Sequence, residues 1–199
     1  MMFAKASSIS LRDGQTAAVR PLEPTDVDAL ATYFEGLSAR TRGFYGPHPF
    51  DRATAQKLCA GIDLAHTARF VAVLSDGRPE AMIVAYMILT RDISQKDAAR
   101  YAAYGQPLDL AACASFAPSV ADAYQEQGLG TAMARHVIAW AEEMGLRQVL
   151  LMGGVQARNE HGRRLYVRLG FRVVGEFDVR RDGEVLDNYD MMLDLCGSR

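Results

Sequence analysis

Apolar residues recur at every third or fourth position along several stretches of the chain, a spacing that predicts amphipathic helices. The clearest stretch begins near Leu129, keeps Met133 and Val137 on the same face, and ends near Met144, where Gly145 is a natural stop. A stretch near residues 96–104 is expected to be partly helical, within an insertion-like polar segment over 92–106. The four main helices are expected at about residues 27–37, 51–60, 129–144 and 160–168.

Runs of β-branched and aromatic residues between these helices favour strands. Three Asp-Gly pairs, Asp13-Gly14, Asp76-Gly77 and Asp182-Gly183, are flanked by such runs, and Asp-Gly tolerates the positive φ angles of a tight hairpin turn. The strand–helix–strand–helix order of the second half adds a parallel or crossover connection. We therefore expect an α/β protein with a mixed, mostly antiparallel sheet of about six to seven strands, flanked by about four helices. Strands are expected at about 16–20, 70–74, 81–89, 111–120, 148–155, 171–179 and 185–195.

Composition narrows the class of protein. The chain has 199 residues, of which 49% are apolar and 23% charged, as in a soluble globular protein with one domain over 1–199. Lys and Arg number 22 against 24 Asp and Glu, a formal charge of −2, so a bulk electrostatic affinity for nucleic acid or an anionic membrane is not expected. The longest apolar run, Ala81 to Leu89, is too short for a membrane-spanning helix.

The N-terminal stretch lacks a signal-peptide pattern. Three cysteines without CxxC spacing argue against a disulfide framework or a zinc ribbon. A cytoplasmic protein without a bound metal is therefore expected.

The segment with the strongest chemical signal joins the strand that ends near Val120 to the helix that begins near Leu129. It carries Gly128 and Gly130 at the helix start, where glycine lets backbone N–H groups approach a ligand. The first turn of a helix presents unpaired N–H donors and the positive end of the helix dipole, which together suit a phosphate or pyrophosphate.

Two other phosphate-binding motifs fit this segment less well. A dinucleotide fingerprint would need a third small residue where Met133 stands, and no acidic residue follows the next strand to hold a ribose. A P-loop would need Gly-Lys followed by Ser or Thr, which is absent. When this segment is taken alone, the alternative stays open that its glycines are needed only for the shape of the turn and not to bind a phosphate.

A second cluster follows at a fixed distance along the chain. Asn159 comes after the expected strand 148–155 and precedes Leu165-Tyr166 and Leu169-Gly170-Phe171. Together with Gln125-x-x-Gly128-x-Gly130, this order and spacing resembles the GNAT superfamily of acetyl-CoA-dependent N-acetyltransferases. The resemblance covers most of the chain, because Leu22 to Leu37 also resembles the opening strand and helix of that family.

The resemblance implies a splayed pair of parallel strands, whose exposed backbone groups would bond the pantetheine arm of acetyl-CoA. Backbone amides from Gln125 to Thr131 would hold the pyrophosphate, and Asn159 would bond the cofactor arm. Tyr166 would act as a general acid toward the departing sulfur, although a tyrosine there can also serve packing alone. The residues expected to bind the cofactor are Ser119, Val120, Gln125, Gln127, Gly128, Leu129, Gly130, Thr131, Asn159 and Tyr166.

Three residues depart from the family pattern. Pro118 lies inside the expected cofactor strand, and proline cannot donate a ladder hydrogen bond. Asp122 lies in the turn Ala121-Asp122-Ala123, where the family usually has a small apolar residue followed by proline. Glu126 occupies a position often filled by glycine, and its carboxylate would lie close to the expected pyrophosphate.

The sequence says less about the substrate that would accept the acetyl group. The expected acceptor is a primary amine of a small molecule or a protein, acetylated directly in a ternary complex, and a homodimer is possible. The run from Leu110 to Val120 contains no carboxylate that could act as a base. A non-catalytic acyl-CoA-binding domain is therefore the alternative function. The aromatic loop 43–50 is a candidate wall of an acceptor pocket or a packed cover, and the candidate bases, by chain position only, are His48, Glu80, Asp109 and Asp187.

Overall fold

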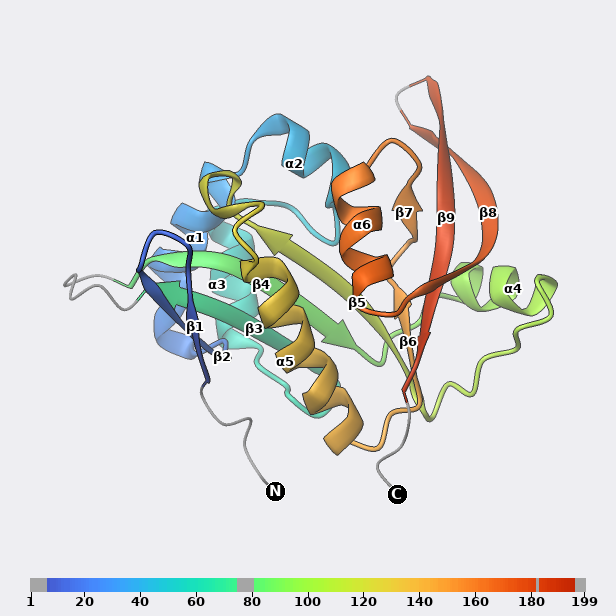
Figure 1. Ribbon diagram of the computed structural model, residues 1–199, viewed down its shortest axis with the longest axis horizontal. Helices are drawn as coiled ribbons and strands as arrows, with labels where there is room; N and C mark the ends of the chain where they lie inside the picture. The colour runs from blue at the N-terminus through green and yellow to red at the C-terminus, as the bar shows by residue number, and fades with distance from the viewer. Residues whose placement is uncertain (1–6, 75–80, 182, 196–199) are drawn as a thin grey trace. The chain divides into compact units, whose positions relative to one another are not determined.

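The computed structural model of the protein describes residues 7–74, 81–181 and 183–195 (Figure 1). The chain folds into two compact units. The first unit comprises Met1–Leu89 and Ala117–Trp140, and the second comprises Thr90–Phe116 and Ala141–Arg199. Across the described residues, nine strands form a mixed sheet in the hydrogen-bonded order β1-β2-β3-β4-β5-β6-β9-β7, and β8 pairs with β9.

The first unit contains β1 to β4, the end of β5, three helices and most of a fourth. Strand β1 (Ser7–Ser10) pairs antiparallel with β2 (Thr16–Pro21), and β2 pairs antiparallel with β3 (Thr67–Leu74). The turn at Asp13-Gly14 is a hairpin as expected, with Gly14 at φ 86°. Strand β4 (Ile83–Thr90) is buried along its whole length. The core of this unit includes Leu30, Phe34, Phe70, Tyr86 and Leu129, all less than 2% exposed.

The helices of the first unit have the expected boundary signals. Helix α1 is Val27–Gly36, preceded by the short 3-10 helix η1 (Pro24–Asp26). Helix α3 (Arg52–Ala60) begins at Asp51, whose side chain accepts from the Thr54 N–H, and ends at Gly61. Between them lies α2 (Ala39–Phe44). Helix α5 (Leu129–Glu143) is followed by Gly145 at φ 74°.

The second unit contains the rest of the sheet. Strand β5 (Cys113–Val120) pairs parallel with β6 (Gln148–Leu151), which confirms the expected parallel pair. Strand β9 (Glu184–Asp194) pairs antiparallel with β6, with the two-residue β7 (Val155–Gln156) and with β8 (Arg172–Arg181). Helix α6 is Glu160–Arg168, and the 3-10 helix η2, which belongs to the first unit, is Asp122–Tyr124.

The insertion-like segment folds against the β8–β9 hairpin within the second unit. It contains α4 (Gln95–Ala103), close to the expected helix 96–104. The Arg100 guanidinium bonds the fully buried carboxylate of Asp190 at 2.7 Å, contacts Asp97, and lies 3.7 Å from the ring centroid of Phe177. Tyr101 donates from its buried hydroxyl to the backbone carbonyl of Met191 at 2.8 Å. The polar segment is therefore part of the fold of this unit.

The expected fold class is confirmed, with three corrections. The described sheet has nine strands instead of six or seven, and the described residues form six α-helices instead of four. The expected strand 148–155 is interrupted, because Gly153 and Gly154 adopt φ angles of 66° and 73° that end β6 before β7 begins. Asp76-Gly77, Glu80 and Asp182 lie outside the described residues. Among the described residues, no helix is both long and apolar enough to cross a membrane.

Candidate active site

The ladder between β5 and β6 ends before β5 does. Its register runs from Cys113 opposite Gln148 to Phe116 opposite Leu151, and the next bond is donated by the Met152 N–H to the Phe116 carbonyl at 3.0 Å. Strand β5 continues for four more residues, to Val120. The parallel pairing therefore stops halfway along β5, as a splayed pair requires.

Pro118 lies in this last part of β5 and costs the sheet no hydrogen bond. The Ala121 N–H donates to the Val84 carbonyl of β4 at 2.9 Å. Because backbone groups alternate between the two edges of a strand, Ser119 also faces β4, and Pro118 and Val120 face the opposite edge. The missing N–H of Pro118 thus falls beyond the last residue paired with β6. This edge presents the carbonyl of Pro118 and the N–H of Val120, one acceptor and one donor for an added strand.

The hydroxyl of Ser119 forms hydrogen bonds inside the first unit. It lies 2.6 Å from the Tyr33 hydroxyl of α1, and it donates to the Tyr86 carbonyl of β4 at 3.3 Å. Ser119 is 6% exposed, and burial raises the pKa of Tyr33, which keeps that phenol neutral. The hydroxyl of Ser119 therefore holds α1, β4 and β5 together, and a direct role toward the cofactor stays a prediction.

The turn after β5 is fastened to α2. Asp122 accepts from the Ser38 N–H at 3.0 Å, the Ser38 hydroxyl at 2.6 Å and the Thr41 hydroxyl at 2.8 Å. Burial acts to raise the pKa of Asp122, but these hydrogen bonds outweigh it and lower the pKa. Gln125 donates from Nε2 to the Val120 carbonyl at 3.0 Å and to the Thr41 hydroxyl at 3.2 Å. Side chains of this turn thus fix the path of the chain into the glycine segment.

The glycine segment has two residues in the left-handed region. Gly128 has φ 89°, and an added Cβ there would meet no atom within 4 Å, so the space beside it is open. Glu126 has φ 62°, and it is the one described non-glycine residue with a positive φ. Glycine adopts such angles without the steric cost that a Cβ imposes. The departure at Glu126 is therefore a strained position within the predicted cofactor loop.

Helix α5 begins directly after this loop. The Ala132 N–H donates to the Gly128 carbonyl at 3.0 Å as the first turn of the helix closes. The N–H groups of Leu129, Gly130 and Thr131 precede that bond, so they have no acceptor within the helix. Gln127 donates from Nε2 to the Ala123 carbonyl at 3.0 Å, and its Oε1 is buried with no hydrogen-bond partner among the described residues. The residues predicted from Ser119 to Thr131 are thus brought together in one unit, at an edge and a helix start that both offer backbone donors.

Asn159 is the N-cap of α6, in the second unit. Its Oδ1 accepts from the Gly162 N–H at 3.0 Å. A Cβ at Gly162 would come within 2.6 Å of the Asn159 amide nitrogen, so the glycine makes room for this cap. The oxygen of Asn159 is committed to the helix, and its amide N–H groups are the part of the side chain that remains for a ligand.

Tyr166 lies on the buried face of α6. It is 9% exposed, and its ring packs against Phe171, which stacks on Phe116. Burial raises the pKa of the Tyr166 phenol, so it is protonated at neutral pH. The structure gives its hydroxyl no hydrogen-bond partner among the described residues. Packing explains the ring of Tyr166 but leaves its O–H donor unassigned.

The aromatic loop packs as a cover on the first unit. His48 lies 5.0 Å from Phe34, 5.6 Å from Phe50 and 5.8 Å from Tyr86, measured between ring centroids. Its Nδ1 lies 2.8 Å from the Pro49 carbonyl, so Nδ1 carries the proton and Nε2 accepts from the Tyr86 hydroxyl at 3.3 Å. Burial lowers the pKa of His48. His48 is thus a neutral, half-buried imidazole whose two nitrogens both have partners.

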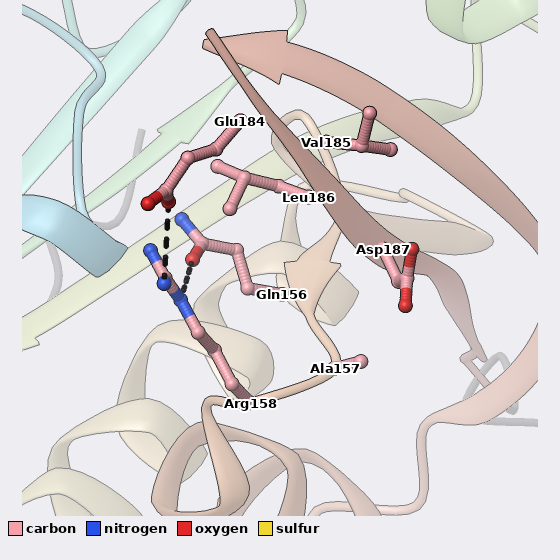
Figure 2. Close-up of a pocket in the computed structure, with 7 residues that line it drawn as sticks. All are labelled: Gln156, Ala157, Arg158, Glu184, Val185, Leu186 and Asp187. Carbon is pink, nitrogen blue, oxygen red and sulfur yellow. Dashed lines mark hydrogen bonds and ion pairs between the residues drawn. The ribbon is translucent and has the colours of Figure 1, made fainter. Parts of the chain in front are cut away.

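The other candidate bases lie at the surface of the second unit. Asp109 forms an exposed ion pair with Arg147. Asp187 lines an open groove of about 390 Å³ (Figure 2), together with Gln156, Ala157, Arg158, Glu184, Val185 and Leu186. Figure 2 shows the Arg158 guanidinium between the Gln156 amide, at 3.0 Å, and the Glu184 carboxylate, at 3.9 Å. The predicted cofactor residues do not line this groove. Glu80 lies outside the described residues.

The hydrogen bonds from Ser38 and Thr41 to Asp122 were not predicted from the sequence. The departure from the family turn marked Asp122 as unusual, but Ser38 lies 84 positions away. The Ser38-to-Thr41 spacing at the start of a short helix was the one local signal, because a serine N-cap accepts from the third residue of its helix, as Ser38 does here. Among the described residues, no group of three or more His, Cys, Asp or Glu side chains is arranged to hold a metal ion.

The arrangement of strand edge, glycine loop and helix start places the chain in a known class. The acetyltransferase (GNAT) family matches residues 32–171, more than two thirds of the sequence. The protein therefore belongs to the GNAT acetyltransferase family. No curated protein is similar enough in sequence to count as a match.

Solved structures share the fold at low sequence identity. The GNAT domain of S. lividans PAT is 23% identical, with 96% of this chain and 97% of that chain covered and a TM-score of 0.67. A putative acetyltransferase from Salmonella typhimurium, solved with its cofactor acetyl-CoA, is 17% identical, with coverage of 92% and 96% and a TM-score of 0.67. The ribosomal-protein-S5-alanine acetyltransferase from Vibrio fischeri is 17% identical, with coverage of 94% and 96% and a TM-score of 0.70.

Proposed function

We propose that the protein is an N-acetyltransferase that transfers an acetyl group from acetyl-CoA directly to a primary amine. The observation that carries the proposal is the free edge of β5, which runs through a fastened turn into the unpaired N–H groups at the start of α5. A strand edge with one donor and one acceptor suits the amide-bearing pantetheine arm, and a helix start suits a diphosphate. Bound acetyl-CoA would supply an acetyl thioester as the electrophile.

Several residues fit the parts of acetyl-CoA. Pro118 and Val120 would bond the pantetheine arm through their backbone groups on the free edge of β5. The N–H groups from Gln127 to Thr131 would bond the pyrophosphate, for which the open space beside Gly128 leaves room. The amide of Asn159 would donate to the cofactor arm. This fit supports acetyl-CoA as the co-substrate.

Tyr166 would act on the leaving group through a hydrogen bond. The acceptor nitrogen forms a bond to the acetyl carbon as the carbon–sulfur bond breaks, which leaves negative charge on sulfur. A thiol resembling that of cysteine has a pKa of about 8.5 and an ordinary phenol one of about 10. Because burial raises the pKa of Tyr166 further, complete proton transfer to sulfur is uphill. Hydrogen-bond donation from the neutral phenol is the contribution that this environment favours.

The acceptor must reach the thioester as a neutral amine. For an amine like that of lysine, with a pKa of about 10.4, loss of the proton at pH 7 costs roughly 4–5 kcal/mol. Burial lowers the pKa of the candidate base His48, which keeps its imidazole neutral at pH 7 and also makes it a weaker base. The Nε2 of His48 already accepts a hydrogen bond from the Tyr86 hydroxyl. The proton of the substrate amine could equally leave through a water relay, or the substrate amine could itself have a depressed pKa.

A thiol-release assay tests the proposal. The protein is incubated with acetyl-CoA and a panel of amines that includes amino acids, polyamines, aminoglycosides and peptides with free α- or ε-amino groups. We expect CoA release with at least one class of acceptor, together with the acetylated amine by mass spectrometry. Acetyl-CoA binding without release across the panel would favour the second candidate, an acyl-CoA-binding domain, for which the strained acidic residue Glu126 is the supporting observation. No binding at millimolar acetyl-CoA would exclude both.

A further inference from the structure

Polar contacts fasten helix α2 to the end of α1 and to the turn that follows β5. None of its six residues is buried. Arg42 donates from Nη2 to the Phe34 and Glu35 carbonyls at the end of α1, at 2.9 and 2.8 Å. The start of the helix is fastened by Asp122. An element with little buried apolar surface and exposed polar attachments belongs to the part of a fold that opens at low free energy. The position of α2 is therefore sensitive to each of these attachments.

Asp122 and Gln125 attach the start of α2 to the turn that leads into the glycine loop. The two oxygens of the Asp122 carboxylate accept three bonds from Ser38 and Thr41, and Gln125 joins Thr41 to the Val120 carbonyl. The same Val120 presents its N–H on the free edge of β5. A ligand that orders the edge and the loop thus orders the residues that hold α2, and neither unit needs to move as a whole.

From this geometry we propose that Asp122 is a positioning residue that couples the acetyl-CoA loop to α2. It holds the turn Ala121–Gln125 in the shape that presents the loop to its ligand, and it transmits the ordering of the loop to α2 and to the aromatic segment that follows. This inference rests on the proposed function, because the ligand that orders the loop is acetyl-CoA. Binding that rigidifies one element through a shared contact is a recognised form of coupling between sites.

Two measurements on four proteins test the coupling. The proteins are the native chain, Asp122→Ala, Ser38→Ala and Asp51→Ala. Asp51→Ala is the matched control, because it also removes a carboxylate that holds the start of a helix, α3, where Asp51 accepts from the Thr54 N–H, and it lies outside the expected cofactor loop. Ser38→Ala alters the α2 side of the contact and leaves the cofactor loop intact. If Asp122→Ala fails to fold, Ser38→Ala therefore tests the coupling in its place. The readouts are the calorimetric dissociation constant for acetyl-CoA and the amide hydrogen exchange of residues 39–44 with and without acetyl-CoA.

In the native chain we expect acetyl-CoA to slow the exchange of residues 39–44. In Asp122→Ala this slowing should disappear, and the dissociation constant should rise about three- to tenfold, as expected for the loss of exposed hydrogen bonds to a carboxylate. Ser38→Ala should show a smaller change in the same direction, and Asp51→Ala should match the native chain in both readouts. A residue that merely stabilised α2 would raise its exchange equally with and without ligand.

The outcomes separate this inference from the proposed function. If the native chain shows no heat with acetyl-CoA, the proposed function fails and the coupling fails with it. If the native chain binds acetyl-CoA but exchange in residues 39–44 does not respond, the coupling alone is overturned. The coupling is also overturned if Asp122→Ala, or Ser38→Ala in its place, retains the native response of α2 or the native dissociation constant.

Discussion

Replacement of Glu126 by glycine should stabilise the protein. Glu126 has φ 62°, and the left-handed conformation costs a residue with a Cβ about 1–2 kcal/mol. Glycine removes that cost, but its greater conformational entropy in the unfolded chain lowers the free energy of unfolding by about 0.4–1 kcal/mol. The difference is a net gain of about 0–1.6 kcal/mol, which corresponds to a rise in melting temperature of up to about 6 °C for a chain of this length.

A second variant distinguishes the effect of the Glu126 charge from the effect of its backbone conformation. Glu126→Gln keeps the strained conformation and removes the carboxylate, so its melting temperature should not rise, because a negative charge near a helix start is stabilising. Both variants should bind acetyl-CoA more tightly than the native chain, since the sequence places this carboxylate within the loop expected to hold the negatively charged pyrophosphate. Calorimetry and thermal unfolding measure the two effects independently.

The matched control for the glycine substitution is Ala139→Gly, on the exposed face of α5. Glycine in an exposed helix interior costs about 1 kcal/mol relative to alanine, so this variant should melt at a lower temperature than the native chain. If Glu126→Gly also melts lower than the native chain, the left-handed conformation of Glu126 is not a source of strain, and the reasoning is refuted.

Three further predictions concern the two units. Tyr166→Phe should lower turnover and leave the dissociation constant for acetyl-CoA nearly unchanged, and unchanged turnover would dismiss the role of its hydroxyl. Arg100→Leu leaves the carboxylate of Asp190 buried without its main partner, which should cost about 3–5 kcal/mol in urea unfolding, and a loss below about 1 kcal/mol would contradict the importance of the pair. Burial lowers the pKa of His48 in the folded protein, so the unfolded chain binds the proton first as pH falls below about 6.5. Stability should therefore fall as the pH drops through about 6.5 towards the lower pKa of the folded state. His48→Phe should show a shallower fall in melting temperature over this range, and equal slopes would show that His48 does not carry this dependence.

Local patterns predicted the elements whose signals lie within a few residues. Helix α3 begins at Asp51 and ends at Gly61 because an N-cap and a C-terminal glycine act on the adjacent turn. The same reasoning failed for the expected strand 148–155. Its apolar run continues through Met152, but two consecutive glycines with positive φ break the strand. Glycine permits a break without requiring one, so the sequence alone does not decide where β6 ends.

The contacts that shape the candidate site are mostly between residues far apart in the chain. Ser38 and Asp122 are 84 positions apart, and Arg100 and Asp190 are 90 apart, so no spacing rule brings either pair together. The motif spacing located the glycine segment, and its backbone explains two departures from the family pattern. Pro118 is tolerated because its missing N–H lies past the end of a ladder, whereas Glu126 holds its position at a cost in backbone strain.

Backbone amide shifts measured by NMR during an acetyl-CoA titration at moderate salt show whether the loop before α5 and the start of that helix bind the pyrophosphate. We expect the largest shift changes to include Gln127, Gly128, Leu129, Gly130 and Thr131. Acetyl-pantetheine, which lacks the pyrophosphate, should leave these five amides nearly unmoved. Saturation with acetyl-CoA that perturbs other amides and leaves these five in place would contradict it.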